Sequence, residues 1–400
     1  MGRAHSLNIW AATLSCANCD LRPYVFDRWG GLTADGGGLN MECFRIDESG
    51  YTGFDLLNPE QRFQGAAAIA ISNEDAARLI KEHFPRLQAS ELKYRALCRR
   101  SGNHPRLLAL MRDLLEGYKS VTYVCDKRFL LVMMFLDWAV EPFYYERGLN
   151  FYEDGQHYGM GSFLAVAGPA LLGEEAFEAM LAAFQRAVRE KSPESLRDLV
   201  ASVRCTKWTE IPEALGPLAQ FADLDCLRAI ATPGVSTDAA IVVIQALISR
   251  MEVMAGGPYR VEHDESKNLA TYRDLLQAFI NHTDEVEFRS SKIAGVKFPL
   301  KLTEVVQVDS KISSAVQLAD VMIGAAIEAG NTLIGQRAGG LDPEALLSLF
   351  ADNQLIHLIP DLDFEGQKEF RRGSQGAELI DYFAANFGPT ISSGAPRRAR

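Results

Sequence analysis

The sequence lacks the features that mark secreted and membrane proteins. Its seven cysteines are odd in number and scattered, so they predict no disulfide framework and favour a reducing, cytoplasmic compartment. We find no signal peptide. The apolar run from Leu130 to Val140 is too short to cross a bilayer and contains Asp137. With 48% hydrophobic residues, the 400-residue chain is expected to form two or three compact units, or one domain with a large insertion.

Basic residues are also fewer than acidic residues. The chain has 41 lysines and arginines against 52 acidic residues, which gives a formal net charge of -11. Such a protein is not a general polyanion binder, so any contact with nucleic acid must be local. The basic stretches Lys93 to Arg100 and Lys292 to Lys301 are candidates for such contacts, although short runs of this kind are usually only solvated. The surplus of carboxylates suits the binding of cations.

Two common ligand-binding motifs are incomplete. Cys16 and Cys19 have the spacing of a zinc ligand pair, but no second pair accompanies them, and a structural zinc needs four ligands. The glycine-rich segment 30–38 lacks the Gly-Lys-Ser/Thr of a phosphate-binding loop. His263, beside Asp264, is a weaker candidate for a catalytic base, since a histidine at a strand end is more often structural.

The periodicity of apolar residues predicts an α/β fold. Strands and helices alternate in two regions that flank a long helical block. The strands are expected at 41–47, 62–72, 120–125, 259–263, 286–288 and 302–308. The helices are expected at 74–84, with Asn73 as the N-cap, at 105–117, 269–281 and 313–330, and in the stretch 342–388.

This pattern divides the chain into five segments. Residues 1–40 are expected to be a disordered or non-native extension, because they are rich in glycine and show no sustained period before Met41 opens a strand. The other four are the first part of the α/β domain, a helical insertion, the second part of the domain, and C-terminal helices with a disordered tail. Their ranges are 41–127, 128–255, 256–335 and 336–400.

Acidic residues follow four of the predicted strands directly, namely Asp47, Asp126, Asp264 and Asp309. Because the carboxyl ends of strands form one edge of a sheet built from crossover units, ligands bind along that edge. Carboxylates gathered there repel one another unless a cation neutralises them, and such oxygen ligands suit Mg²⁺ or Mn²⁺. Any single Asp is more often a turn or helix cap, but four in one chain make a shared site the better hypothesis.

Two further groups of polar residues stand out. Asp320 lies in an otherwise apolar helix, where a buried carboxylate needs a cation or strong hydrogen-bond donors. Gln317 lies three residues earlier on the same face. Glu91 and Lys93 alternate, so both face one side if the segment is extended. Together they could bind a metal and a phosphate, although an exposed charged pair is the more common explanation.

In their order along the chain, these residues resemble the motifs of the bacterial DESG-motif domain of unknown function, a family grouped with ribonuclease-H-like folds. The resemblance covers 41–330, and the long helical insertion departs from the family pattern. It implies a mixed sheet with helices on both faces, and acids on central strands and on a late helix. The motifs are Asp47-Glu48-Ser49-Gly50, Glu91-x-Lys93, Asp264-Glu265-Ser266, and Asp309-Ser310-Lys311 leading to Gln317-Leu318-Ala319-Asp320.

The resemblance also implies roles for individual residues. Asp47 would be a metal ligand on the first strand and Asp320 a ligand on the late helix. Either Asp126 or Asp264 would be the third ligand, and Asp264 is preferred because its Asp-Glu-Ser matches the motif. Glu91 would be a ligand or lie beside one. Lys93 and Lys311 would hold the substrate phosphate. The secondary candidates are Glu48, Asp126, Asp309, Lys311 and Gln317.

The implied activity is that of a nuclease, which hydrolyses phosphodiesters in nucleic acid with two Mg²⁺ or Mn²⁺ ions held by carboxylates. A second hypothesis is a non-catalytic module whose helical insertion binds a partner protein or nucleic acid. A third, weaker hypothesis is another phosphotransfer or phosphohydrolase enzyme that uses the same metals. The nuclease hypothesis requires Asp47, Asp320 and at least one of Asp126 and Asp264 to converge in the folded protein.

Overall fold

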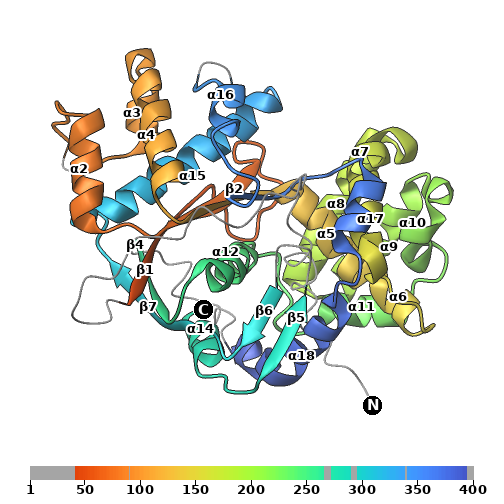
Figure 1. Cartoon of the computed structure of the whole chain (residues 1–400). Helices are drawn as coiled ribbons and strands as arrows, with labels where there is room; N and C mark the ends of the chain where they lie inside the picture. The colour runs from red at the N-terminus through yellow and green to blue at the C-terminus, as the bar shows by residue number, and fades with distance from the viewer. Residues whose placement is uncertain (1–40, 90, 265–271, 290–294, 338–339, 394–400) are drawn as a thin grey trace, which may run out of the picture.

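A computed structural model describes residues 41–89, 91–264, 272–289, 295–337 and 340–393 (Figure 1). The predicted extension at residues 1–40 and the predicted disordered tail at residues 394–400 lie outside the described residues, as do Glu265 and Ser266. Within the described residues, no helix combines the length and the apolar character needed to span a membrane.

A mixed sheet of six strands lies at the centre of the fold, which confirms the predicted α/β class. Its spatial order is β7-β4-β1-β2-β3-β8. Strand β2 runs antiparallel to both of its neighbours, and the other neighbours are parallel, so the carboxyl ends of the remaining five strands meet at one edge. The strands are β1 (Glu42–Ser49), β2 (Phe63–Ile69), β3 (Ser120–Asp126), β4 (Tyr259–Asp264), β7 (Leu302–Val308) and β8 (Leu355–Leu358).

Strand β8 corrects the prediction for the C-terminal region. The stretch 342–388 was expected to be helical, yet Leu355–Leu358 is a strand that pairs in parallel with β3. Four residues are too few to display either the helical or the strand period, and the conformation comes from pairing with the edge of β3. A second unpredicted strand, β6 (Gly295–Phe298), pairs with β5 (Val286–Arg289) in a separate sheet of two strands.

Helices cover both faces of the six-stranded sheet (Figure 1). On one face, α15 (Ser314–Leu333) crosses β1 and β2, and α2 (Asn73–His83), α3 (Tyr94–Cys98) and α4 (His104–Gly117) lie around it. On the other face, α12 (Ala240–Met254) packs against β2 and β3. The apolar side chains form a separate buried core on each side of the sheet, and burial of both cores drives the folding of the chain.

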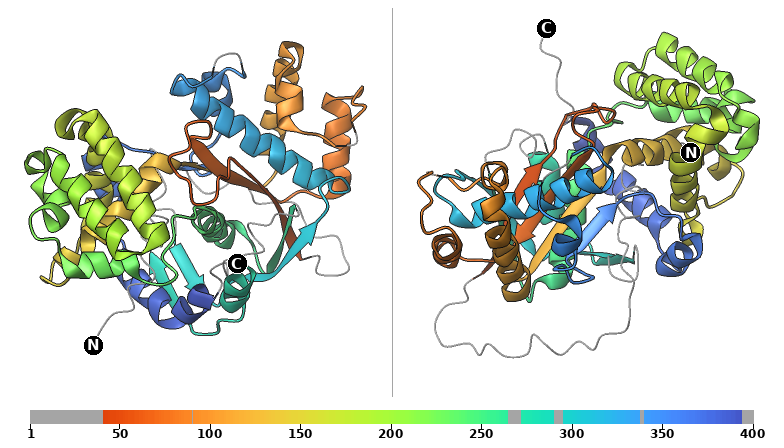
Figure 2. Two further views of the ribbon diagram at one scale, coloured as in Figure 1. Left: turned by 180° about the vertical axis from the view of Figure 1, so that it is seen from behind. Right: turned by 90° about the horizontal axis from the view of Figure 1, so that it is seen from above.

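The region between β3 and β4 contains helices and no strand in its described residues, as predicted. Helix α5 is apolar around its whole circumference and is therefore almost completely buried within this helical block. The block lies beside the sheet, but its last helix, α12, returns to cover the sheet (Figure 2). The other helices of the block are α5 (Lys127–Ala139), α6 (Glu141–Tyr145), α7 (Gln156–Leu172), α8 (Glu174–Glu190), α9 (Pro193–Cys205), α10 (Pro212–Ala219) and α11 (Leu224–Ala231).

The remaining helices follow β4, and all but the first of them lie in the C-terminal region. Helix α14 lies within the predicted helix 269–281, whose first three residues are outside the described part of the chain, and it contacts the last helix, α18. These helices are α14 (Arg273–Ile280), α16 (Pro343–Leu347), α17 (Phe364–Arg371) and α18 (Gly376–Ser393).

The start of α2 corrects another prediction. Ser72, and not Asn73, is the N-cap, and its hydroxyl accepts a hydrogen bond from the amide of Asp75 at 3.0 Å. The side-chain oxygen of Asn73 instead accepts hydrogen bonds from the Ser313 hydroxyl and the Ala315 amide. Asn73 therefore ties α2 to the first turn of α15 and helps to fix α15 on the sheet.

The close packing of α15 on β2 depends on Gly65. A Cβ atom at this position would lie 2.0 Å from the carbonyl oxygen of Tyr123 and 2.8 Å from Cδ1 of Ile323 on α15. We expect Gly65→Ala to lower the free energy of unfolding by about 1–3 kcal/mol, because the sheet or the helix must shift. Urea denaturation measures this difference. In the control Gly117→Ala, the new Cβ meets nothing within 4 Å, so an equal loss in both variants would contradict the packing argument.

Candidate active site

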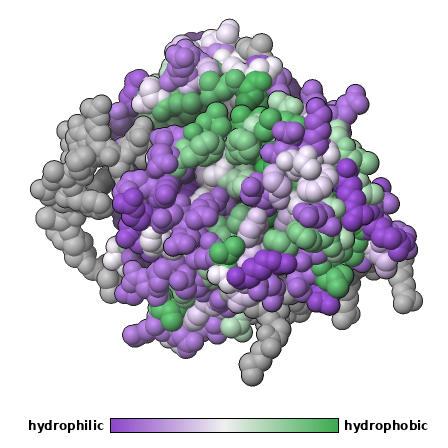
Figure 3. All heavy atoms as spheres, turned by 90° about the vertical axis from the view of Figure 1, so that its right-hand side faces the viewer, coloured by the Kyte–Doolittle hydropathy of each residue, from purple (hydrophilic) through white to green (hydrophobic). Residues whose placement is uncertain are grey.

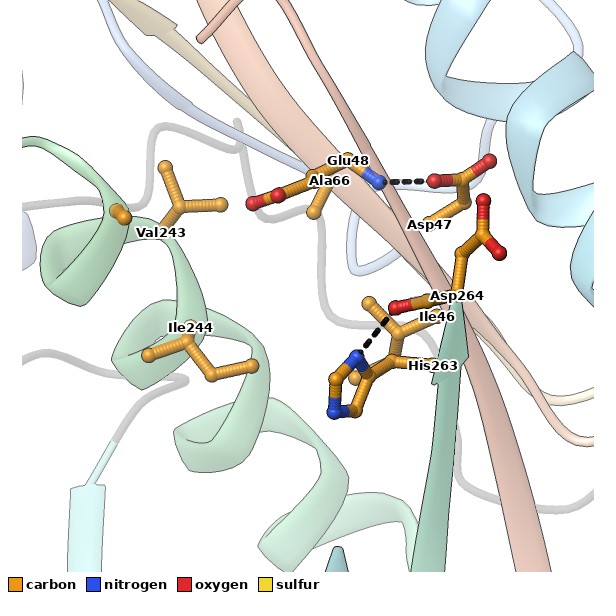
Figure 4. Close-up of a pocket in the computed structure, with 9 residues that line it drawn as sticks. Ile46, Asp47, Glu48, Ala66, Val243, Ile244, His263 and Asp264 are labelled. Atoms are coloured by element: carbon orange, nitrogen blue, oxygen red, sulfur yellow. Dashed lines mark hydrogen bonds between the residues drawn. The ribbon is translucent and has the colours of Figure 1, made fainter. Parts of the chain in front are cut away.

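Asp47 lies within β1 and not after it, because the strand continues to Ser49. Alternation along the strand sends Phe44 and Ile46 into the core on the α12 side and places Asp47 on the opposite side, toward α15. The side chain of Asp47 is 8% exposed. Its Oδ1 accepts a hydrogen bond of 2.8 Å from the amide of Glu48 (Figure 4).

Asp264, the last residue of β4, lies beside Asp47. The parallel register pairs Ile46 with His263, so the next step along both strands brings the two aspartates level. Figure 4 shows their carboxylates next to each other. Oδ1 of Asp264 accepts a hydrogen bond of 3.1 Å from the amide of Ser310, which follows β7. The structure therefore brings Asp47 and Asp264 together, as predicted, although Asp47 lies two residues before the end of its strand.

Helix α15 brings Asp320 to the same place from above the sheet. Its Oδ2 accepts a hydrogen bond of 2.8 Å from the amide of Tyr94, the first residue of α3. Gln317 lies almost one turn earlier and connects two loops. Its Oε1 accepts from the amide of Leu92 at 2.9 Å, and its Nε2 donates to the carbonyl of Ser310 at 2.7 Å. The Gln317 side chain thus positions the segments on either side of Asp320.

Glu91 and Lys93 complete the group. The ammonium of Lys93 lies 2.9 Å from Oε1 of Glu91, and the same oxygen accepts a hydrogen bond of 2.7 Å from the Ser310 hydroxyl. Partial burial lowers the pKa of Lys93, but the hydrogen bond to Glu91 and the charges of Asp320 and Asp47 outweigh it and raise the pKa. Lys93 therefore remains a cation that faces the aspartates.

Burial makes the Asp47 carboxylate unfavourable. Burial, together with the charge of Asp320, raises the pKa of Asp47 to about 7, and the charge of Asp264 adds to the rise. The Lys93 ammonium and the hydrogen bond from Glu48 oppose this rise without cancelling it. Burial also raises the pKa of Asp320. The site thus concentrates more negative charge than its own groups neutralise.

This donor set suits a hard divalent cation. Asp47, Asp264 and Asp320 offer carboxylate oxygens, which Mg²⁺ and Mn²⁺ prefer, and the raised pKa of Asp47 indicates that a nearby cation would be favourable. Among the described residues, no three side chains of the His, Cys, Asp and Glu types are already directed at a common metal position. Binding would therefore include rotation of one or more carboxylates.

Asp126 does not join this group, although it too was a candidate for the third ligand because it ends a predicted strand. It ends β3, which is separated from β1 by β2. Its carboxylate caps α5 through the amides of Arg128 and Phe129, and it accepts two hydrogen bonds of 2.7 Å from the Arg62 guanidinium. Asp126 thus has the structural role of a helix cap, which is the common role of an acid after a strand.

The secondary candidates lie around the site with different contacts. Asp309 is exposed, and its carboxylate accepts a hydrogen bond from the amide of Lys311. Lys311 is exposed too. Burial tends to raise the pKa of Glu91, but the hydrogen bonds from Ser310 and Lys93 outweigh burial and lower this pKa, and the charge of Lys311 contributes to the lowering. Ser310, to which we gave no role from the sequence, connects Asp264, Glu91 and Gln317. Its place inside the Asp309-Ser310-Lys311 motif was the available signal.

Glu48 points to the other side of β1, as alternation requires. It lines a recess between the strand ends and α12 with His263 and several apolar side chains (Figure 4). Nδ1 of His263 lies 2.7 Å from the carbonyl oxygen of Asp264, and burial lowers the pKa of the imidazole. The apolar residues of this recess are Ile46, Ala66, Ala240, Val243 and Ile244.

The Asp-Glu-Ser-Gly motif ends in a turn that requires glycine. Gly50 has a φ of +83°, and a Cβ there would lie 2.1 Å from the carbonyl oxygen of Phe63. The buried ammonium of Lys127 donates hydrogen bonds to the carbonyl of Gly50 and the hydroxyl of Thr52. Burial lowers the pKa of Lys127 to about 8. The last residue of the motif therefore shapes the turn after β1.

Comparison with protein-family models, curated proteins and solved structures yields no significant match for this chain. The likeness to the DESG-motif family rests on the motif residues alone and stays a prediction. The geometry is independent of that likeness. It brings five of the predicted residues into one group, namely Asp47, Glu91, Lys93, Asp264 and Asp320.

The raised pKa of Asp47 predicts a pH dependence of stability in the metal-free protein. Between pH 4 and 7 the folded state keeps a proton that the unfolded state loses, so stability falls as pH rises. Asp47→Asn removes this effect and retains an oxygen for the Glu48 amide. We expect it to stabilise the protein by about 2–4 kcal/mol at pH 8, and by progressively less toward pH 5. Urea denaturation in EDTA across this range measures the difference, and a pH-independent difference would refute the assignment.

Proposed function

We propose that this chain is a divalent-metal-dependent nuclease with a ribonuclease-H-like fold. The convergence of Asp47, Asp264 and Asp320 carries the proposal, since they come from β1, β4 and α15 and share one buried, negatively charged place. A mixed sheet with helices on both faces, and with acids on central strands and a late helix, is what the ribonuclease-H-like fold implies. No described cysteine forms a disulfide, which fits a reducing, cytoplasmic compartment.

The residues of the chain have distinct roles in this proposal. Asp47, Asp264 and Asp320 would hold Mg²⁺ or Mn²⁺, which would activate water and stabilise the leaving oxygen of a phosphodiester. Lys93 faces the aspartates and would pair with a non-bridging phosphate oxygen as a point charge. Glu91 orients that ammonium through their ion pair.

Calorimetric titration of Mn²⁺ into the purified protein tests the metal site. Wild type should bind Mn²⁺ saturably, and Asp47→Asn should lose at least tenfold in affinity, because a central ligand loses its charge. The matched control is Asp309→Asn, since Asp309 is an exposed aspartate whose carboxylate accepts a hydrogen bond from Lys311 outside the cluster. It should bind Mn²⁺ as wild type does. Equal binding by all three proteins would mean that the ion binds elsewhere.

Hydrolysis of bis(p-nitrophenyl) phosphate tests the chemistry without demanding a particular nucleic acid. Wild type should release nitrophenol only when Mn²⁺ or Mg²⁺ is present, and Asp47→Asn and Asp320→Asn should each reduce the rate at least a hundredfold. Asp309→Asn again serves as the control. Metal binding without hydrolysis of this ester or of oligonucleotides would leave the carboxylates with a structural role.

A second candidate function is a module that binds a partner protein through the helical block. Helix α7 is apolar on all sides but is only partly covered, with Phe163 and Val166 37% and 47% exposed. Leu362 and Phe364, at the start of α17, are exposed as well, and Phe364 lies near α7. Figure 3 shows apolar residues gathered on this side of the molecule. This function is preferred if the protein neither binds Mn²⁺ nor cleaves a phosphodiester.

A further inference from the structure

The segment from residue 86 to 112 is basic, although the whole chain is acidic. It contains seven arginine or lysine residues and a single acidic residue, Glu91, which gives a net charge of +6 in a chain of net charge -11. It includes Lys93 of the candidate active site and forms α3 and the first part of α4. A segment of locally positive charge therefore adjoins the aspartates through Lys93.

The arginines of this segment lack acidic partners. Arg95, Arg99, Arg100 and Arg106 are exposed, and none of them forms an ion pair with a carboxylate in the part of the chain that the structure describes. Three exposed arginines of the helical block are instead paired with acids at short distances: Arg186 with Asp198, Arg197 with Glu194, and Arg228 with Asp225, at 2.8, 2.9 and 2.8 Å. The guanidinium groups near the site are thus available to anions from outside the chain.

Helix α3 contains Arg95 and is followed directly by Arg99 and Arg100, and it runs away from the site along α15. It begins at the Tyr94 amide, which binds Asp320, and it ends at Cys98, whose thiol lies 3.0 Å from Glu328, two turns further along α15. Arg99 follows Lys93 by six residues, about 9 Å of helical rise. Successive phosphates of one strand lie about 3.4 Å apart along a duplex axis, so this distance corresponds to about three nucleotides.

A fifth arginine reaches the same surface from the end of α15. Burial raises the pKa of the Cys98 thiol to about 11, and the charge of Arg337 is near enough to oppose that rise. Arg337 is exposed and lacks an acidic partner among the described residues. Figure 1 shows α3 and α4 beside α15, and the reverse view in Figure 2 agrees. We refer to Arg95, Arg99, Arg100, Arg106 and Arg337 as the arginine surface.

We propose that the arginine surface binds the phosphate backbone of a nucleic-acid strand that enters the carboxylate site beside Lys93. The inference rests on the proposed function and deepens it, because it assigns the surface that holds the nucleic-acid substrate. Guanidinium groups bind phosphate oxygens in a bidentate manner and stay charged at any physiological pH. A basic surface confined to one face of an acidic protein also keeps the contact local.

Fluorescence anisotropy with a labelled 20-nucleotide oligothymidylate tests the proposal. The full chain is titrated in EDTA, which prevents cleavage, at several salt concentrations. The variant Arg95→Gln/Arg99→Gln/Arg100→Gln should bind at least tenfold more weakly at 0.1 M salt. The slope of log K against log salt should become shallower by about 2, since each lost contact with a single strand removes about 0.7.

The matched control removes the same charge from elsewhere. Arg186→Gln/Arg197→Gln/Arg228→Gln lowers the net charge by the same amount at exposed helical positions, and it should bind within about twofold of wild type. Thermal midpoints of both variants should stay within about 2 °C of wild type, as expected for surface substitutions. Equal weakening in both variants, or no binding by wild type at low salt, would overturn the inference. Hydrolysis of bis(p-nitrophenyl) phosphate by wild type judges the proposed function separately.

Discussion

The negative charge buried at the carboxyl edge of the sheet constrains everything around it. Asp47 is nearly inaccessible to water, and Asp264 and Asp320 lie close enough to raise its pKa. Burial of a charge costs free energy unless partners compensate it. Lys93 and several backbone amides provide part of that compensation, and the pKa of about 7 shows that it is incomplete. This remaining cost is what the proposed divalent cation would offset.

Hydrogen bonds through Ser310 and Gln317 hold this arrangement in position. Ser310 contacts Asp264 through its amide and Glu91 through its hydroxyl, and its carbonyl accepts a hydrogen bond from Gln317. Gln317 also binds the amide of Leu92. These contacts join the segment before α3 to the loop after β7 and to helix α15, which lie more than 200 residues later in the sequence. A shift of any one of them would therefore displace the carboxylates relative to one another.

Local sequence signals predicted the acids of the site, but they could not separate these acids from one that lies outside it. Asp47, Asp264 and Asp320 were predicted because a carboxylate within or directly after an apolar strand or helix is unfavourable unless a cation or hydrogen-bond donors stabilise it. The same signal pointed to Asp126, which caps α5 and pairs with Arg62. Asp126 differs from the site acids in the position of its strand within the sheet. The order of the strands depends on pairing between segments that are distant in the sequence. For the same reason the sequence did not predict β8, whose four residues become a strand only beside β3.

Helix α3 connects the two charged features of the molecule. A helix of five residues is too short to be stable alone, and its ends are held by Asp320 at the Tyr94 amide and by Glu328 at Cys98. The site carboxylate of Asp320 therefore helps to position Arg95, which lies in this helix, and Arg99 and Arg100, which follow it. Asp320 thus has a structural contact of its own, through the Tyr94 amide, besides its place among the aspartates. In the proposed function the same carboxylate would hold the metal and anchor α3, which would tie the position of a bound strand to that of the metal.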